Sequence, residues 1–172
     1  MQQAQFITKA VAEDSDAIAR LINSAYQGEP GSRAWTSEGQ YMEGQRTAVE
    51  DIGRLLNRPG IDNFKYCTES GEITGFVSLE KHDRHIYLGL LSVSPSHQAA
   101  GIGRRLLEFG EAYAKENQKE AMLITVINIR HELIAWYERR GYRATGKTIP
   151  FPNGGHNAPK VPLHLIEMKK PV

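Results

Sequence analysis

The sequence predicts an α/β (α+β) protein in which helices flank one mixed, mostly antiparallel β-sheet. Strand-like and helix-like segments alternate along most of the chain, and three consecutive strand-like segments are joined by short polar turns. No internal repeat or low-complexity tract interrupts them. We therefore expect the order β-α-α-β-β-β-α-β-α-β-β in a single domain over residues 1–172.

The N-terminal third is predicted to contain one short strand and two helices. The strand is FITK at residues 6–9, and Asp14 or Ser15 caps the helix that follows it. A second helix is expected over residues 47–57, and it should end there because a Pro-Gly pair stands shortly after it. The intervening residues 27–46 are rich in glycine and polar groups, which predicts an irregular segment.

The remaining elements are predicted from the spacing of apolar residues, which alternates in strands and recurs every three to four residues in helices. Strands are expected at residues 64–69, 72–80, 85–93, 122–126, 142–148 and 163–169. Helices are expected after a Gly-x-Gly sequence near residue 102 and over residues 131–140. Residues 149–162 contain four prolines and should form an irregular loop over one end of the sheet.

Composition narrows the class of partner. The 21 basic and 20 acidic residues leave a formal net charge of +1, which argues against nucleic acid or an anionic membrane as a partner. The single Cys67 cannot form an internal disulfide, as in proteins of a reducing compartment. The N-terminal MQQAQFITKA lacks a basic start and an apolar segment, so we expect a cytoplasmic protein.

The junction between the third central strand and the next helix is the most informative stretch. Gly101 and Gly103 have no Cβ, so the backbone there turns tightly and its N–H groups are open to a ligand. Apolar residues at helical spacing follow, so the junction is predicted to be a helix N-terminus. Such a terminus favours an anion such as phosphate or pyrophosphate.

Two common phosphate-binding motifs do not fit this junction. A P-loop requires Gly-Lys-Ser/Thr, whereas Arg104 and Arg105 follow Gly103 here. A dinucleotide-binding fingerprint requires a small residue where Leu106 stands, and it opens a βαβ unit instead of following three antiparallel strands.

A third pattern fits more of the chain. Residues 90–108, LLSVSPSHQAAGIGRRLLE, resemble the acyl-CoA-binding motif of the GNAT superfamily of N-acetyltransferases. In that motif a strand ends in Val and a Pro follows, before Gln/Arg-x-x-Gly-x-Gly/Ala. The matching residues are Val93, Pro95, Gln98, Gly101 and Gly103.

A downstream segment matches the second motif of the same family. NIRHELIAWYERRGYRATG, which begins at Asn128, places Tyr137 in a helix and has Gly141-Tyr142 where the family usually has Gly-Phe. Together the two motifs extend the resemblance over residues 64–148. The resemblance implies a GNAT-like fold and acetyl-CoA as co-substrate.

The resemblance also implies how acetyl-CoA is held. The pantetheine arm would lie between the strands ending at Val93 and Val126, and the helix N-terminus would hold the pyrophosphate. Arg104 is expected to contribute its backbone and not its side chain. Asn128 has a competing role as a helix N-cap. The residues that the resemblance assigns to the cofactor are Leu91, Ser92, Val93, Gln98, Ala99, Ala100, Gly101, Ile102, Gly103, Arg104 and Asn128.

The resemblance makes Tyr137 the predicted catalytic residue, as a hydrogen-bond donor to the departing thiolate. A thiol has a pKa of about 8.5 and tyrosine about 10, so full proton transfer would be uphill by roughly 2 kcal/mol. The alternative is that Leu133, Trp136 and Tyr137 form an ordinary apolar helix face.

The acceptor amine must lose a proton before it attacks, because aliphatic amines have pKa values near ~10.4. Glu38 and Glu80 are candidate bases, and a water relay is the third possibility. Trp35, Glu38 and Glu80 are the predicted substrate-binding residues. Trp35 and its neighbour Tyr41 have an alternative role in anchoring an irregular loop to the core.

No metal site is predicted. His82 and His85 flank Asp83-Arg84, which favours a tight hairpin turn, and no cysteine or further histidine completes a ligand set.

The resemblance implies one of two functions. The first is an enzyme that transfers an acetyl group from acetyl-CoA to a primary amine of a small molecule or peptide. The alternative is a non-catalytic acyl-CoA-binding sensor or interaction module on the same fold. The sequence is compatible with a homodimer and does not identify the acceptor.

Overall fold

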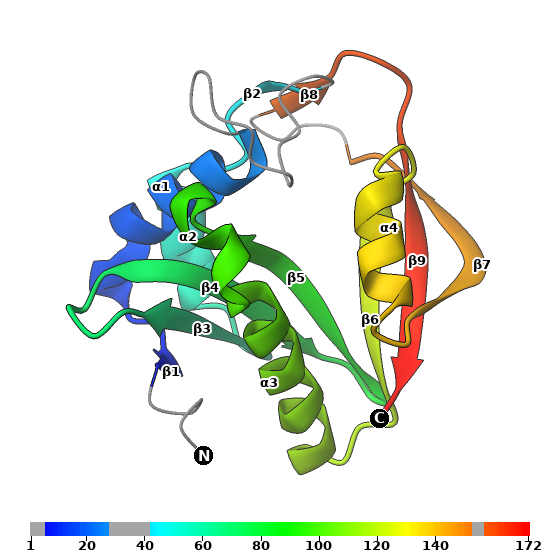
Figure 1. Ribbon diagram of the computed structural model, residues 1–172, viewed down its shortest axis with the longest axis horizontal. Helices are drawn as coiled ribbons and strands as arrows, with labels where there is room; N and C mark the ends of the chain where they lie inside the picture. Colours follow the sequence, from blue (N-terminus) through cyan, green and yellow to red (C-terminus); the bar gives the residue numbers. More distant parts are fainter. Residues whose placement is uncertain (1–5, 28–41, 153–156) are drawn as a thin grey trace.

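The computed structural model describes residues 6–27, 42–152 and 157–172, and these ranges contain four α-helices and nine strands (Figure 1). The helices are α1 (Ser15–Gln27), α2 (Val49–Leu56), α3 (Ile102–Glu116) and α4 (His131–Glu138). The strands are β1 (Ile7–Lys9), β2 (Met42–Gly44), β3 (Ile61–Cys67), β4 (Ile73–Lys81), β5 (His85–Val93), β6 (Ala121–Ile127), β7 (Arg143–Pro150), β8 (Asn157–Pro159) and β9 (His164–Pro171).

Seven of the strands form one mixed sheet, which confirms the predicted fold class. The strand order is β1-β3-β4-β5-β6-β9-β7. All neighbours are antiparallel except β5 and β6, which run parallel. The parallel pair is joined through α3, as a crossover connection requires.

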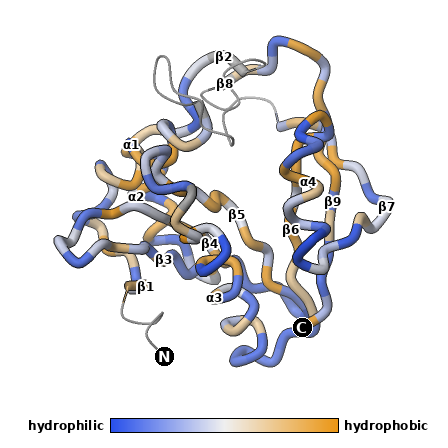
Figure 2. The backbone as a smooth tube through the Cα atoms, in the orientation of Figure 1, coloured by the Kyte–Doolittle hydropathy of each residue, from blue (hydrophilic) through white to orange (hydrophobic). Residues whose placement is uncertain are grey.

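Helices cover both faces of the sheet. Successive side chains of β4 point to opposite faces, so neighbouring residues pack against different helices. Phe76 packs with buried residues of α1 and α2, including Ile18 and Ile52. The next residue, Val77, faces the other way and packs in a larger cluster with residues of α3 and α4, including Leu106. Figure 2 shows apolar segments along β4, β5 and β6, between the helices.

The parallel pair β5 and β6 separates after a few residues. Their pairing runs from His85 with Ala121 to Tyr87 with Leu123, although both strands continue beyond it. A register shift against β4 interrupts β5, and Leu90 has a positive φ of 53° there. This bulge redirects the second half of β5 away from β6, which leaves the V-shaped opening seen in Figure 1.

Several features differ from the sequence-based prediction. Strand β3 begins at Ile61 instead of residue 64, and α2 spans Val49–Leu56 instead of residues 47–57. A 3₁₀ helix, Pro95–Ala100, fills the turn before α3. Strands β2 and β8 were not predicted, because each has three residues and their pairing joins Met42 to Pro159, far away in sequence.

The start of α1 also differs in detail. A 3₁₀ turn over Ala12–Asp14 precedes α1, and the Asp14 carboxylate accepts the N–H of Val11 at 2.9 Å. The Ser15 hydroxyl donates to the carbonyl of Ala12 at 2.7 Å. Within the described ranges, no helix is long and apolar enough to span a membrane.

Candidate active site

A cavity of about 1080 Å³ occupies the opening between β5 and β6. Its walls come from the end of α1, the second half of β5, the first turn of α3, the outer half of β6 and one face of α4. Phe151 and Pro152, which follow β7, close one side of it. The cavity therefore lies where the bulge in β5 parts the two parallel strands.

Hydroxyl groups hold the cavity walls in place. The hydroxyl of Tyr87, in the last residue pair of β5 and β6, lies 2.6 Å from the hydroxyl of Thr125, two residues beyond that pair on β6. The Tyr26 hydroxyl at the end of α1 donates to the carbonyl of Leu91 at 3.2 Å. The first contact links β5 to β6 where their pairing ends, and the second ties the bulged part of β5 to α1.

The first turn of α3 opens onto this cavity. Gly101 is the N-cap residue and has a φ of 77°, a conformation that glycine adopts without strain. A Cβ added at Gly103 would lie 3.6 Å from a methyl carbon of Val93 and 4.0 Å from the Trp136 ring. The Gln98 side chain donates to the Val93 carbonyl at 3.3 Å, which ties the turn to the end of β5. This glycine-lined helix start suits a pyrophosphate.

Most residues assigned to the cofactor lie together at the cavity. Those that line it are Leu91, Val93, Gln98, Ala100, Gly101, Gly103 and Arg104. Ala99 lies in the preceding 3₁₀ helix, so its backbone is close to the same turn. The proposed roles in binding stay predictions, but the fold brings these residues to one place.

Three of the assigned residues lie away from the cavity surface. Ser92 is 2% exposed, and its hydroxyl donates to the Leu90 carbonyl at 2.8 Å. Ile102, the first residue of α3, is buried in the hydrophobic core. Asn128 follows β6, and its Oδ1 accepts the N–H of His164 at 3.1 Å. The competing interpretation of Asn128 as a helix N-cap is wrong, because Arg130 occupies that position.

Tyr137 belongs both to the core and to the cavity. It is 6% exposed, and its ring packs edge-on against Trp136 and Tyr142, with centroids 4.9 and 5.5 Å away. It also lines the cavity, near Tyr26 and Tyr87. Burial raises the pKa of the Tyr137 hydroxyl well above its usual range. The group therefore stays protonated and is suited to donate a hydrogen bond.

Of the residues predicted to bind the acceptor amine or to line its pocket, only Glu80 lies within the described part of the chain. Trp35, Glu38 and Tyr41 lie outside the described residues. Glu80 pairs with Tyr87 in the sheet, but its carboxylate lies 3.5 Å from His82 Nε2 and does not line the cavity.

Asp51 on α2 is the one carboxylate among the described residues that line the cavity. It forms an ion pair with Arg54. The described part of the cavity therefore offers no carboxylate without an ionic partner.

Arginines that the sequence analysis did not single out also line the cavity. Arg130 is 2% exposed, and its Nε donates to the Glu132 carboxylate at 2.6 Å. The Arg46 guanidinium lies 5.5 Å from the centre of the Tyr26 ring. Arg140 follows α4. For Arg130 and Arg140 the available signal was the Arg-rich second motif, but spacing alone does not show which of its arginines face inward. Arg46 lies outside that motif.

His82 and His85 stack with ring centroids 4.6 Å apart at the β4–β5 turn. Burial, together with the charge of His82, lowers the pKa of His85. Among the described residues, no group of three histidine, cysteine or acidic side chains is placed to hold a metal ion.

Comparison with known proteins identifies relatives of the chain. The family model described as the acetyltransferase (GNAT) family matches residues 18–142. A mycothiol acetyltransferase of Acidothermus cellulolyticus is 26% identical over 160 residues, covering 83% of this chain and 45% of the relative. Another, from Propionibacterium freudenreichii subsp. shermanii, is 23% identical and covers 81% and 43%. The chain thus spans less than half the length of these relatives.

Solved structures share the fold. The ribosomal-protein-S18-alanine N-acetyltransferase from Escherichia coli has a TM-score of 0.70 at 18% identity, with 96% of this chain and 92% of that chain covered. A ribosomal-protein-alanine N-acetyltransferase from Brucella melitensis has a TM-score of 0.72 at 20% identity, with 96% and 99% covered. At these identities the likeness concerns the fold alone.

Proposed function

Because the chain belongs to the acetyltransferase (GNAT) family, we propose that it transfers an acetyl group from acetyl-CoA directly to the primary amine of a small molecule or peptide. The observation that carries the proposal is the cavity between β5 and β6. It brings the glycine-lined start of α3 and the protonated Tyr137 hydroxyl to the same opening.

The cofactor would be held mainly by backbone groups. The α3 N-terminus offers amides that lack intrahelical partners, and Gly101 and Gly103 leave them accessible. The pantetheine arm would lie along the bulged half of β5, where pairing with β6 has ended. A backbone N–H between Leu91 and Val93 would then polarise the thioester carbonyl.

Tyr137 would assist the leaving group. Its raised pKa makes full proton transfer to a thiolate still less favourable than for an ordinary tyrosine. We therefore assign it a hydrogen bond to the departing sulfur and not complete protonation. Its packing against Trp136 and Tyr142 fixes the direction of the hydroxyl.

We assign removal of the amine proton to a water relay, with Glu38, which lies outside the described residues, as the other candidate. Glu80 does not line the cavity, and Asp51 is paired with Arg54. The hydroxyl groups of Tyr87 and Thr125 at the cavity floor offer partners for ordered water.

The direct test measures release of free CoA from acetyl-CoA in the presence of a panel of amino acids, polyamines, amino sugars and peptides. The proposal predicts thiol release that depends on one class of amine, with an acetylated product detected by mass spectrometry. Tight acetyl-CoA binding without turnover on any amine would instead support the non-catalytic sensor module. Absence of acetyl-CoA binding would contradict both.

A further inference from the structure

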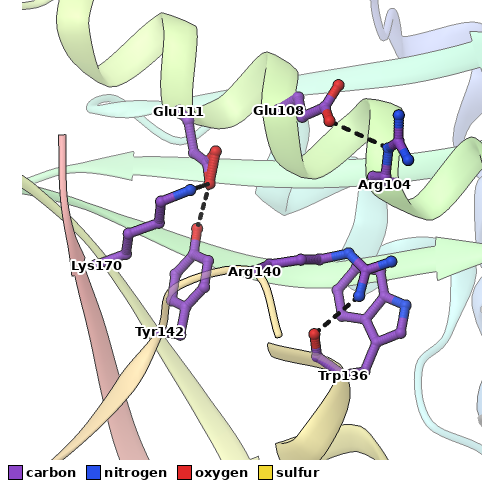
Figure 3. A network of polar contacts seen from close by, with 7 residues as sticks. All are labelled: Arg104, Glu108, Glu111, Trp136, Arg140, Tyr142 and Lys170. Carbon is purple, nitrogen blue, oxygen red and sulfur yellow. Dashed lines mark hydrogen bonds and ion pairs between the residues drawn. The ribbon is translucent and has the colours of Figure 1, made fainter. Parts of the chain in front are cut away.

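Two arginines from separate elements line the same cavity. Arg104 lies in the first turn of α3, and Arg140 follows Arg139, the C-cap residue of α4. Both line the cavity, and Figure 3 shows both guanidinium groups beside the start of α3. Burial and the positive charges of Arg139 and Arg104 lower the pKa of Arg140, which is consistent with this proximity.

Arg140 is held in a fixed orientation by Trp136. Its guanidinium carbon lies 3.9 Å from the centre of the indole ring, and its Nη1 donates to the Trp136 carbonyl at 2.9 Å. The Trp136 ring in turn lies 4.0 Å from the position that a Cβ on Gly103 would take. The stacked guanidinium is therefore placed next to the predicted pyrophosphate site and loses little further freedom on binding an anion.

Arg140 has no ion-pair partner of its own within the described part of the chain, although the charge of Glu108 acts on it. Arg104 pairs with Glu108 at 3.2 Å, whereas no described carboxylate forms an ion pair with Arg140. Glu111, further along α3, pairs with Lys170 at 2.7 Å and Tyr142 at 3.4 Å (Figure 3). The Nε of Arg140 is buried and has no hydrogen-bond partner. Buried donors are normally paired, so the hydrogen bonding of this guanidinium is incomplete within the described part of the chain.

We propose that Arg140, positioned by Trp136, binds the ribose 3′-phosphate of coenzyme A and makes the cavity selective for CoA over 3′-dephospho-CoA. This inference rests on the proposed function. The pyrophosphate is assigned to the amides at the start of α3, so the 3′-phosphate is the anionic group of the cofactor that still needs a partner. A planar guanidinium matches a phosphate dianion through paired hydrogen bonds.

The test compares CoA and 3′-dephospho-CoA by isothermal titration calorimetry. The unmodified protein should bind CoA about 10-fold or more tightly than the dephosphorylated form, the effect expected of hydrogen bonds to a charged group. Arg140→Met should bind the two ligands within about 3-fold of each other, with an unchanged Kd for 3′-dephospho-CoA. Arg140→Lys keeps the charge but loses the stacked planar fork, and should retain only part of the preference.

Arg139→Met is the matched control. It removes the same charge from the adjacent, exposed residue, which does not line the cavity, and should keep the full preference for CoA. An equal loss of affinity for both ligands in Arg140→Met would place Arg140 on the pyrophosphate and overturn the inference. Equal affinities in the unmodified protein would overturn it too. No binding of either nucleotide would overturn the proposed function itself, and this inference with it.

Discussion

The packing and burial of Tyr137 determine the orientation and the protonation state of its hydroxyl. The ring is part of the hydrophobic core, yet the residue reaches the cavity between the splayed strands. The sequence analysis treated a core role and a catalytic role as alternatives. The structure shows that the core packing is compatible with a catalytic role, because the packing fixes the ring and burial keeps the hydroxyl protonated.

Tyr137→Phe removes the hydroxyl and keeps the ring packing. We expect kcat to fall by roughly 10- to 1000-fold, the range seen when one transition-state donor is lost, with little change in thermal stability. Steady-state kinetics with acetyl-CoA and the accepted amine measure this. A changed KM with an unchanged kcat would assign Tyr137 to binding or to the core.

The pH dependence of the same enzyme provides a second measurement. Because the pKa of Tyr137 is raised, loss of its proton should not limit the rate at any pH below the usual tyrosine value of about 10. The rate should instead rise with pH as the amine is deprotonated. A decline in kcat between pH 8 and about 10, absent in Tyr137→Phe, would contradict the raised pKa.

Gly103 is the residue at which a side chain would obstruct the predicted pyrophosphate site. A single Cβ there would be in ordinary contact with Val93 and Trp136, so the fold should tolerate it. Gly103→Ala should therefore weaken acetyl-CoA binding only slightly. Gly103→Val adds two methyl groups toward the cavity and should abolish binding while the circular dichroism spectrum stays native. Calorimetry that gives Gly103→Val the affinity of the unmodified protein would sink the assignment.

Among the elements, β5 creates the cavity. Its first three residues pair with β6, and the bulge at Leu90 then turns the strand away. A positive φ is uncommon for leucine and costs about 1–3 kcal/mol, so surrounding contacts must hold it. Those contacts include the packing of Leu90 against the α1–α2 cluster and the bond from Tyr26 to Leu91.

Leu90→Val tests this element. A β-branched residue is disfavoured in the left-handed conformation, so the variant should lower the melting temperature and weaken acetyl-CoA binding by distorting the bulge. Leu91→Val makes the same chemical change at the adjacent position, which has no positive φ. It should have the smaller effect on both measurements. Equal effects in the two variants would show that the backbone conformation of Leu90 does not maintain the cavity.

The sequence predicted nearly all of the long elements because each has its own periodicity. The seven-stranded sheet, α1, α3 and α4 were anticipated with boundary errors of a few residues. Strands β2 and β8 escaped prediction because a three-residue strand has no measurable alternation, and its stability comes from a partner more than 100 residues away.

The candidate site was only partly predictable for a related reason. Glycines, Gln98 and Tyr137 stand at motif positions, so their spacing identifies them. Arg140 follows Arg139, and only the packing of α4 shows which of the two lines the cavity; Arg130 has no arginine beside it and no assigned motif role. Ser92 and Ile102 are buried because of the direction in which their side chains point from β5 and α3, and local sequence does not determine that direction.

At the scale of the whole molecule, two segments predicted to be irregular are joined. Strand β2 ends the segment 27–46 and β8 lies within 149–162, and the two pair from Met42–Pro159 to Gly44–Asn157. Phe151 and Pro152 of the second segment line the cavity, as does Arg46 of the first. The pairing lies on the same side of the molecule as the open end of the V (Figure 1). We therefore propose that these joined segments select the acceptor.

Replacing residues 153–158 with a Gly-Ser linker tests that proposal, because it removes part of β8 and breaks its pairing with β2. Acetyl-CoA affinity should stay nearly intact, since the residues assigned to the cofactor lie on β5, in the 3₁₀ helix, on α3 and just after β6 and α4, outside the replaced segment. The KM for the amine should rise, or the preference among amines should change. Trp35→Ala should change the amine profile in the same way if that side chain contributes to the pocket. The control replaces Glu69-Ser70-Gly71, the exposed β3–β4 turn, with an equal Gly-Ser linker and should leave both substrates unaffected. Identical amine profiles for the unmodified protein, the 153–158 replacement and Trp35→Ala would show that the acceptor pocket lies elsewhere.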